Sequence, residues 1–218
     1  MKTDPETFIL DNTSVMSPPH VPEIRLHLAD EAHDLWLKTE DELEEIGLPP
    51  PFWAFAWAGG QGLARYVLDH PDAVAGKRVV DFASGSGLVA IAAMKAGAMS
   101  VLAADIDPWT RTAIGINSRL NNVDLAITEH DLIGEVIDAD VLLAGDVFYD
   151  VGFANALIPW FKVLTEAGKT VIVGDPGRSY CPKHLMEPLA TFEVPVTRAL
   201  EDAEVKRTTV WKFIGHSA

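Results

Sequence analysis

The sequence predicts an α/β fold in which a mostly parallel, doubly wound sheet ends in an antiparallel pair of strands. From residue 77 onward, short apolar runs alternate with helical segments, which is typical of βαβ units in a Rossmann-like sheet covered on both faces. A glycine-rich turn follows the first of these runs, as at the first strand-to-helix turn of many α/β proteins. The last two apolar runs are joined by too few residues for a crossover helix, so we expect them to be antiparallel.

The residues before this α/β region predict an N-terminal arm followed by an extension of the domain. Residues 1–20 carry three prolines among polar side chains, so we expect a loosely ordered arm there. Residues 21–218 fit one domain, because a single hydrophobic core stops growing only near ~250 residues. The extension at 21–70 is predicted to hold a short strand at 24–28, an acidic helix from Asp30 to about Ile46, and then a loop and an amphipathic helix within 52–68.

Seven strands are predicted for the main sheet. Five apolar runs are expected to form its parallel part, at 78–82, 100–104, 125–128, 139–144 and 169–173. Two more runs, at 191–196 and 205–214, are expected to form the antiparallel pair at the C-terminal end of the chain. The carboxyl edge of the parallel strands is where a sheet of this class binds its ligand.

The composition excludes several classes of partner. The chain has 17 Lys and Arg against 32 Asp and Glu, a net charge of −15, and that field repels DNA and RNA while it attracts cations. No apolar run approaches the ~20 residues that cross a bilayer, and the first residues do not match a secretory or organelle signal. We therefore expect a cytoplasmic monomer without nucleic-acid or membrane partners.

The cysteine and histidine content predicts neither a disulfide nor a metal site. Cys181 is the only cysteine, so an intrachain disulfide is excluded, and no nucleophile signature surrounds it. The seven histidines show no ligand spacing and accompany no cysteine cluster. We expect Cys181 to be a loop or core residue.

The glycine turn predicts a bound nucleoside. Gly85 and Gly87 permit a tight turn and a close approach of backbone to ligand, and Ala90 occupies the third position of the dinucleotide fingerprint. Asp81 precedes the turn, where a carboxylate repels a pyrophosphate but suits the ammonium and sulfonium groups of S-adenosylmethionine. This favours S-adenosylmethionine over NAD, and an NAD-dependent oxidoreductase remains an alternative on the glycines alone.

Carboxylates also follow the next three strands. Asp105 lies 20 residues after Gly85 and is the expected ribose ligand, whereas Asp107, before Pro108, fits a helix N-cap. After the third strand, Asp131 and Leu132 are expected to contact an adenine, although a surface turn explains them equally well. After the fourth strand comes a run that joins an acid to aromatic residues, Gly145-Asp146-Val147-Phe148-Tyr149.

This set of motifs resembles the seven-strand lysine methyltransferases that carry an Asp-x-x-Tyr or Asp-x-x-Phe motif. The aromatic segment 52–66 narrows the resemblance to the electron transfer flavoprotein β-subunit lysine methyltransferase family. It implies a Rossmann-like seven-strand methyltransferase fold, S-adenosylmethionine as the cofactor and S-adenosylhomocysteine as the product. The cofactor-binding residues that it implies are Trp57, Asp81, Ala83, Gly85, Gly87, Asp105, Asp131, Leu132 and Gly145.

The resemblance also implies the acceptor side of the site. Asp146 is expected to orient the amine of a protein lysine, with Tyr149 packed against its aliphatic stem, and the β subunit of electron transfer flavoprotein is the suspected substrate. The sequence departs from the family where Ala83 replaces a glycine, Leu132 a tryptophan and Ala58 a proline. Two alternatives stay open: an N-methyltransferase of a small amine, similar to nicotinamide methyltransferases, and a catalytically idle cofactor-binding partner protein.

Overall fold

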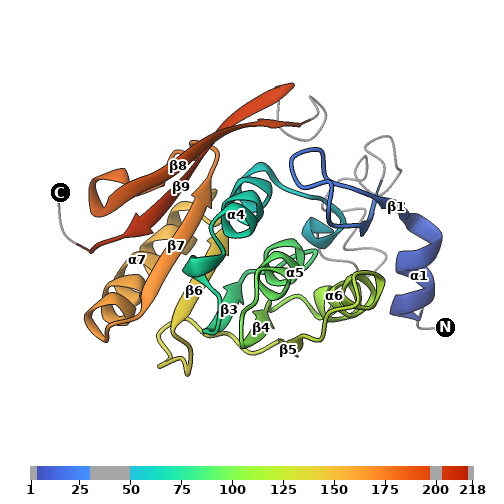
Figure 1. Cartoon of the computed structure of the whole chain (residues 1–218), viewed down its shortest axis with the longest axis horizontal. Helices are drawn as coiled ribbons and strands as arrows, with labels where there is room; N and C mark the ends of the chain where they lie inside the picture. Colours follow the sequence, from blue (N-terminus) through green and yellow to red (C-terminus); the bar gives the residue numbers. More distant parts are fainter. Residues whose placement is uncertain (1–3, 30–49, 197–202, 216–218) are drawn as a thin grey trace.

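A computed structural model of the chain describes residues 4–29, 50–196 and 203–215. Its main feature is a sheet of seven strands with helices on both faces (Figure 1). A separate two-stranded sheet pairs β1 (Ser14–Met16) with β2 (Leu26–Leu28) in antiparallel fashion. The acidic helix expected between Asp30 and Ile46 lies outside the described residues.

The main sheet confirms the predicted topology. Its order is β5-β4-β3-β6-β7-β9-β8, in which β3 to β7 are parallel to one another and β9 is antiparallel to both β7 and β8. The bounds are β3 Arg78–Phe82, β4 Ser100–Ala104, β5 Ala126–Thr128, β6 Val141–Gly145, β7 Thr170–Asp175, β8 Met186–Pro195 and β9 Val205–Phe213. The predicted strand at 191–196 is longer than expected, because β8 begins at Met186 and continues through a bulge between Pro188 and Ala190.

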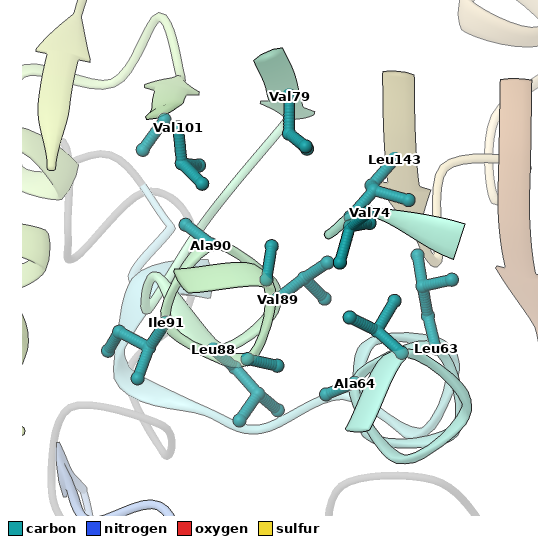
Figure 2. Packing of buried hydrophobic residues seen from close by; sticks show 14 of the residues in the cluster. Leu63, Ala64, Val74, Val79, Leu88, Val89, Ala90, Ile91, Val101 and Leu143 are labelled. Atoms are coloured by element: carbon teal, nitrogen blue, oxygen red, sulfur yellow. The ribbon is translucent and has the colours of Figure 1, made fainter. Parts of the chain in front are cut away.

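The central strands are buried on both faces because successive side chains alternate between two cores. Val79 joins the core on one face, together with Leu143 of β6, whereas Val80 joins the core on the other. Figure 2 shows Val79 and Leu143 over Val89 and Leu63, which come from two of the helices that cover the first face. Two-sided burial explains why these strands are continuous apolar runs in the sequence.

Among the described residues, three helices cover the first face and one covers the second (Figure 1). On the first face lie α4 (Ala58–Asp69), α5 (Leu88–Lys95) and α6 (Pro108–Leu120), each of which leads into or follows one of the central strands. On the second face lies α7 (Val151–Glu166), which buries Leu157, Trp160 and Phe161 against the sheet. Short 3-10 turns precede α4, follow it and precede β8, at Phe52–Ala54, Pro71–Ala73 and Lys183–Leu185.

The N-terminal residues contain secondary structure where we expected a loosely ordered arm. Helix α1 (Pro5–Asn12) has Asp4 as its N-cap, whose carboxylate accepts a hydrogen bond from the Thr7 amide at 3.0 Å, and Pro5 is in the first helical turn. Ile9 is fully buried in a small core with Trp53 and Phe55. The prolines suggested an arm without regular structure, but the Asp4 cap and the burial of Ile9 stabilise a helix there.

Glycines allow the start of α4 to touch the ends of two strands. Gly59 packs against Gly174 at the end of β7, and Gly60 packs against Gly145 at the end of β6, with backbone facing backbone. A β-carbon added at Gly59 would lie 2.5 Å from the carbonyl oxygen of Gly174 and 2.7 Å from the amide nitrogen of Asp146. The first turn of α4 is therefore fixed directly over the carboxyl edge of the sheet.

The contact of Gly59 predicts a matched pair of variants. Gly59→Ala should lower the free energy of unfolding by about 3 kcal/mol, the upper end of the usual cost of overpacking, because backbone atoms cannot move aside. Gly60→Ala should be neutral or stabilising by up to ~1 kcal/mol, since its β-carbon meets only Val89 at 4.0 Å and alanine favours a helix. Urea unfolding of both variants checks this, and equal stability of the two would contradict the packing described.

Candidate functional site

A cavity of about 760 Å³ opens at the carboxyl edge of the parallel strands. Its wall comes from the ends of β3, β4, β6 and the loop after β5, from the segment that leads into α4, and from the loop after β7. The lining residues include Phe52, Trp57, Ala83, Gly85, Asp105, Asp107, Asp131, Ile133, Gly145, Asp146, Tyr149, Asp150, Phe153 and Arg178. A smaller cavity of about 40 Å³ shares Trp57, Ala83, Gly85 and Gly145 with it and adds Asp81.

Asp81 is the penultimate residue of β3 and fixes the turn that follows. Its Oδ2 accepts hydrogen bonds from the Ser84 hydroxyl at 2.5 Å and from the Ala90 amide in the first turn of α5 at 2.9 Å. The residue is 1% exposed, and burial raises the pKa of its carboxyl group to about 7, with a smaller contribution from the negative charge of Asp105. Within the described part of the chain no hydrogen bond reaches Oδ1, so that oxygen can receive a cationic group from the smaller cavity.

The turn itself uses left-handed backbone at three positions. Gly85 (φ 54°) and Gly87 (φ 83°) adopt this conformation as glycines readily do, but Ala83 adopts it as well, with φ 52°. Ala83 and Gly85 line both cavities. Gly87 lines neither cavity and is instead the N-cap of α5, packed near Ile114. Gly87 was expected among the cofactor-binding residues, but its position in the structure supports a role in turning the backbone.

Asp105 and Asp107 make different contacts, and Asp107 is the helix N-cap that the sequence predicted. Asp105 lines the cavity and accepts hydrogen bonds from the amides of Gly85 at 2.9 Å and Asp107 at 3.1 Å. It thereby ties the glycine turn to the end of β4, and burial raises its pKa. Asp107 is the N-cap of α6, with its carboxylate 2.9 Å from the Trp109 amide, and burial raises its pKa to about 6.

The loop after β5 places one of its two predicted residues at the cavity and the other away from it. Asp131 is exposed, lines the cavity and accepts a hydrogen bond from the Ile133 amide at 3.0 Å. Leu132 does not line the cavity but packs against the core beneath α7. Ile133, which packs against the same core, lines the cavity instead.

Asp146 lies where β6 meets α4, and its carboxylate is held at both oxygens. Oδ2 accepts a hydrogen bond from the Gly59 amide at 3.1 Å, and Oδ1 accepts one from Nε of Arg178 at 2.6 Å. The residue is 8% exposed and has φ 62°, a conformation that costs energy for any residue other than glycine. Strain of this kind persists where the surrounding structure requires it, and it is concentrated at functional sites.

Arg178 reaches Asp146 from a loop that Asp175 fixes. Asp175 ends β7 and is 1% exposed. Its Oδ1 accepts hydrogen bonds from the amides of Gly177 at 2.7 Å and Arg178 at 2.9 Å. The ion pair of Arg178 and Asp146 is largely buried, with 24% and 6% of the two side chains exposed. The cation is thus positioned through the backbone of its own loop.

Aromatic side chains form the remaining wall of the cavity. Trp57 donates its indole N–H to the carbonyl of Phe52 at 3.0 Å and meets the Phe52 ring edge to face, with centroids 5.9 Å apart. Tyr149 lies 6.1 Å from Phe52 and 5.7 Å from Phe153, between ring centroids. Tyr149 is 55% exposed, so it forms part of the rim, and partial burial together with the neighbouring carboxylates raises its pKa.

Cys181 lies beside the site without the properties of a nucleophile. Burial and the charge of Asp175 raise the pKa of its thiol far above the ordinary value, so it stays protonated at neutral pH. Among the residues at 4–29, 50–196 and 203–215, no group of three His, Cys, Asp or Glu could hold a metal ion. In those same ranges no helix has the length and apolar character needed to cross a membrane.

The cavity is strongly anionic. Of the residues that the structure describes, five carboxylates line it, those of Asp105, Asp107, Asp131, Asp146 and Asp150, against a single arginine, Arg178. Apolar and aromatic side chains between them offer surfaces for a flat ring. This arrangement suits a nucleoside that carries positive charges rather than a dinucleotide that carries phosphates.

The sequence did not reveal three residues of this site. Gly59, Asp175 and Arg178 position Asp146 but were given no role. Gly59 belongs to a Gly-Gly pair, a signal of close backbone approach, and Asp175 stands at the end of a predicted strand just as Asp105 and Asp146 do. Ligands bind at the carboxyl ends of parallel strands. That rule also indicates Asp175 and, after the Pro-Gly turn, Arg178 as candidates for the site.

Solved structures with this fold include methyltransferases. The magnesium protoporphyrin IX methyltransferase from Synechocystis PCC 6803, crystallised with S-adenosylmethionine, matches 71% of this chain and 80% of its own at 16% identity, with a TM-score of 0.52. The carboxylates here fit the same cofactor, because Asp81 can meet an ammonium group and Asp105 a ribose. S-adenosylmethionine is the cofactor of this chain, and it supplies an electrophilic methyl group when bound.

Sequence comparison identifies the family. The model of the ribosomal protein L11 methyltransferase family matches residues 66–174. The electron transfer flavoprotein beta subunit lysine methyltransferase of Xenopus laevis is 39% identical, with 97% of this chain and 87% of that protein covered. The protein of the same name from Danio rerio is 38% identical, with 96% and 83% covered. The chain therefore belongs to the electron transfer flavoprotein β subunit lysine methyltransferase family.

Proposed function

We propose that this protein transfers methyl groups from S-adenosylmethionine to a lysine of the β subunit of electron transfer flavoprotein. The observation that carries the proposal is the Asp146 carboxylate, which the Gly59 amide holds at the cavity wall at 3.1 Å, next to the aromatic rim. A carboxylate in that place is a hydrogen-bond acceptor for an amine. The names of the relatives supply the substrate.

The residues of the chain divide the work between cofactor and acceptor. Asp81, Asp105 and Asp131 would bind the amino acid, ribose and adenine parts of the cofactor, and Trp57 would cover its methionine end.

Tyr149 and Phe52 at the rim would receive the aliphatic stem of the lysine. Asp146 would accept a hydrogen bond from the amine and hold its lone pair toward the methyl group. Such alignment can supply ~7–11 kcal/mol of the barrier.

The charge of the cavity supports a lysine as the acceptor. Five carboxylates attract an ammonium group from solution, and the exposed Tyr149 leaves the rim open to a side chain presented by another protein. A small free amine would need a closed pocket. We therefore favour a protein substrate over the small-amine alternative.

Labelling with a methyl donor tests the proposal. The purified protein, incubated with tritiated S-adenosylmethionine and recombinant electron transfer flavoprotein β subunit, should label that subunit on lysine, as located by peptide mass spectrometry. The same reaction with nicotinamide should give no labelled product. If nicotinamide is methylated and the protein subunit is not, the small-amine enzyme is favoured. If the protein binds S-adenosylhomocysteine but transfers no methyl group to any acceptor, an idle partner protein is favoured.

A further inference from the structure

Arg178 is the only cation that the described residues place in the cavity wall, and it forms an ion pair with Asp146, the carboxylate expected to meet the substrate. Arg178 joins five carboxylates in that wall, and its Nε lies 2.6 Å from Oδ1 of Asp146. An arginine stays protonated at every relevant pH, so this charge is permanent. The pair is formed without substrate, and its position calls for an explanation beyond stability.

The position of Arg178 is built from the sheet outward. Asp175 is buried at the end of β7 and binds the amides of Gly177 and Arg178, so the backbone that carries the guanidinium is fixed to the sheet. Asp146 is fixed from the other side by the Gly59 amide. Two elements therefore hold the two charges in contact across the cavity wall.

We propose that Arg178 is a positioning residue that keeps the acceptor lysine of the proposed reaction in its unprotonated, reactive form. An unpaired Asp146 carboxylate would attract the lysine ammonium and raise its pKa, which opposes loss of the proton. With Arg178 in place, the carboxylate is neutralised and a positive charge lies near the acceptor nitrogen. The first effect removes an influence that would raise the pKa of the amine, and the second lowers that pKa from its ordinary value near ~10.4.

Other charged and titratable groups surround the acceptor position, and they explain why a local cation is needed. Asp105 follows β4 and Asp107 precedes α6, while His130 and Asp131 lie in the loop after β5. Tyr149 and Asp150 precede α7, and Asp175 ends β7. The carboxylates among them favour the protonated amine. In the part of the wall that the structure describes, Arg178 is the residue whose charge opposes them at all pH values.

The pH dependence of kcat tests this role, because a residue with a merely structural role would not shift it. At saturating S-adenosylmethionine and electron transfer flavoprotein β subunit, Arg178→Gln should raise the midpoint of the rise in kcat with pH by about 1 unit, as expected for a unit charge at moderate separation. The loss of kcat at pH 7.5 should then be about tenfold and should shrink at higher pH. Arg178→Lys, which keeps the charge, should restore the midpoint.

The controls separate this inference from the proposed function on which it rests. S-adenosylhomocysteine should bind Arg178→Gln within about twofold of wild type, because the cofactor carboxylates are untouched. An equal loss of kcat at every pH, with an unchanged midpoint, would overturn the role of Arg178 while leaving the methyltransferase intact. If the wild-type protein labels no protein lysine, the proposed function fails instead.

Discussion

Replacement of Asp146 by asparagine is expected to lower kcat for methyl transfer about 100-fold and to leave the affinity for S-adenosylhomocysteine within a few fold. The expected size is that of a preorganised group that acts on the reacting atoms, ~3 kcal/mol. The amide keeps an oxygen for the Gly59 N–H but loses the negative charge that pairs with Arg178. Single-turnover kinetics together with calorimetric binding of S-adenosylhomocysteine measure the two effects separately.

Asparagine is the sharper substitution because of the backbone of Asp146. The residue has φ 62°, a region that asparagine and aspartate tolerate better than other residues with a side chain. Asp146→Ala would add a conformational cost of about 1 kcal/mol to the loss of the carboxylate, which would mix stability with chemistry. A glycine would relieve the strain but free the backbone.

Asp150 offers a matched control for Asp146. It lies in the same cavity wall, and its carboxylate is the N-cap of α7, 2.8 Å from the Phe153 amide. Asparagine is as good a cap as aspartate, so Asp150→Asn should keep kcat within about threefold. If both variants lose kcat equally, the effect belongs to the overall charge of the cavity and not to Asp146.

The predictable part of this site is the part that follows from strand ends. Asp81, Asp105 and Asp146 each follow an apolar run, and parallel strands bring their carboxyl ends to one edge, so the three meet in the structure as expected. The alternation of Val79 and Val80 between two cores likewise follows from the twofold period of a strand.

The parts that could not be predicted depend on contacts between segments far apart in the chain. Nothing near Gly59 in the sequence indicates that its amide binds Asp146, 87 residues away. Leu132 was expected beside the adenine, but the neighbouring Ile133 lines the cavity, and no local pattern distinguishes these two apolar side chains. A local pattern identifies an acid at a strand end, but it does not identify the groups that hold it.

Asp81 leads to the second large expected effect, a dependence of cofactor binding on pH. Its pKa in the ligand-free protein is raised to about 7 by burial, so below that pH the carboxyl group is mostly neutral. An ammonium group at Oδ1 favours the ionised form, and binding must then release a proton. The affinity for S-adenosylhomocysteine should fall as pH decreases below about 7, by up to ~10-fold per unit, and should level off above it.

Asp81→Asn isolates this effect. At pH 8 the variant should bind S-adenosylhomocysteine about 10- to 100-fold more weakly, the range for loss of a hydrogen bond to a charged group, and the dependence below pH 7 should disappear. Asp124→Asn removes an exposed carboxylate outside the cavity and should match wild type at every pH. Calorimetry at pH 6 in two buffers of different ionisation enthalpy should detect a proton released by wild type and none by Asp81→Asn.

The stability of the ligand-free protein gives an independent check of the same carboxyl group. An acid whose pKa is higher in the folded than in the unfolded state binds more protons when folded, so its contribution to stability is present at low pH and is lost as pH rises from about 4 to about 7. Relative to wild type, Asp81→Asn should therefore gain stability over that range. A constant difference in the free energy of unfolding from pH 4 to pH 8 would show that the charge on Asp81 costs nothing in the ligand-free fold, and the pH dependence of cofactor binding would then need another residue.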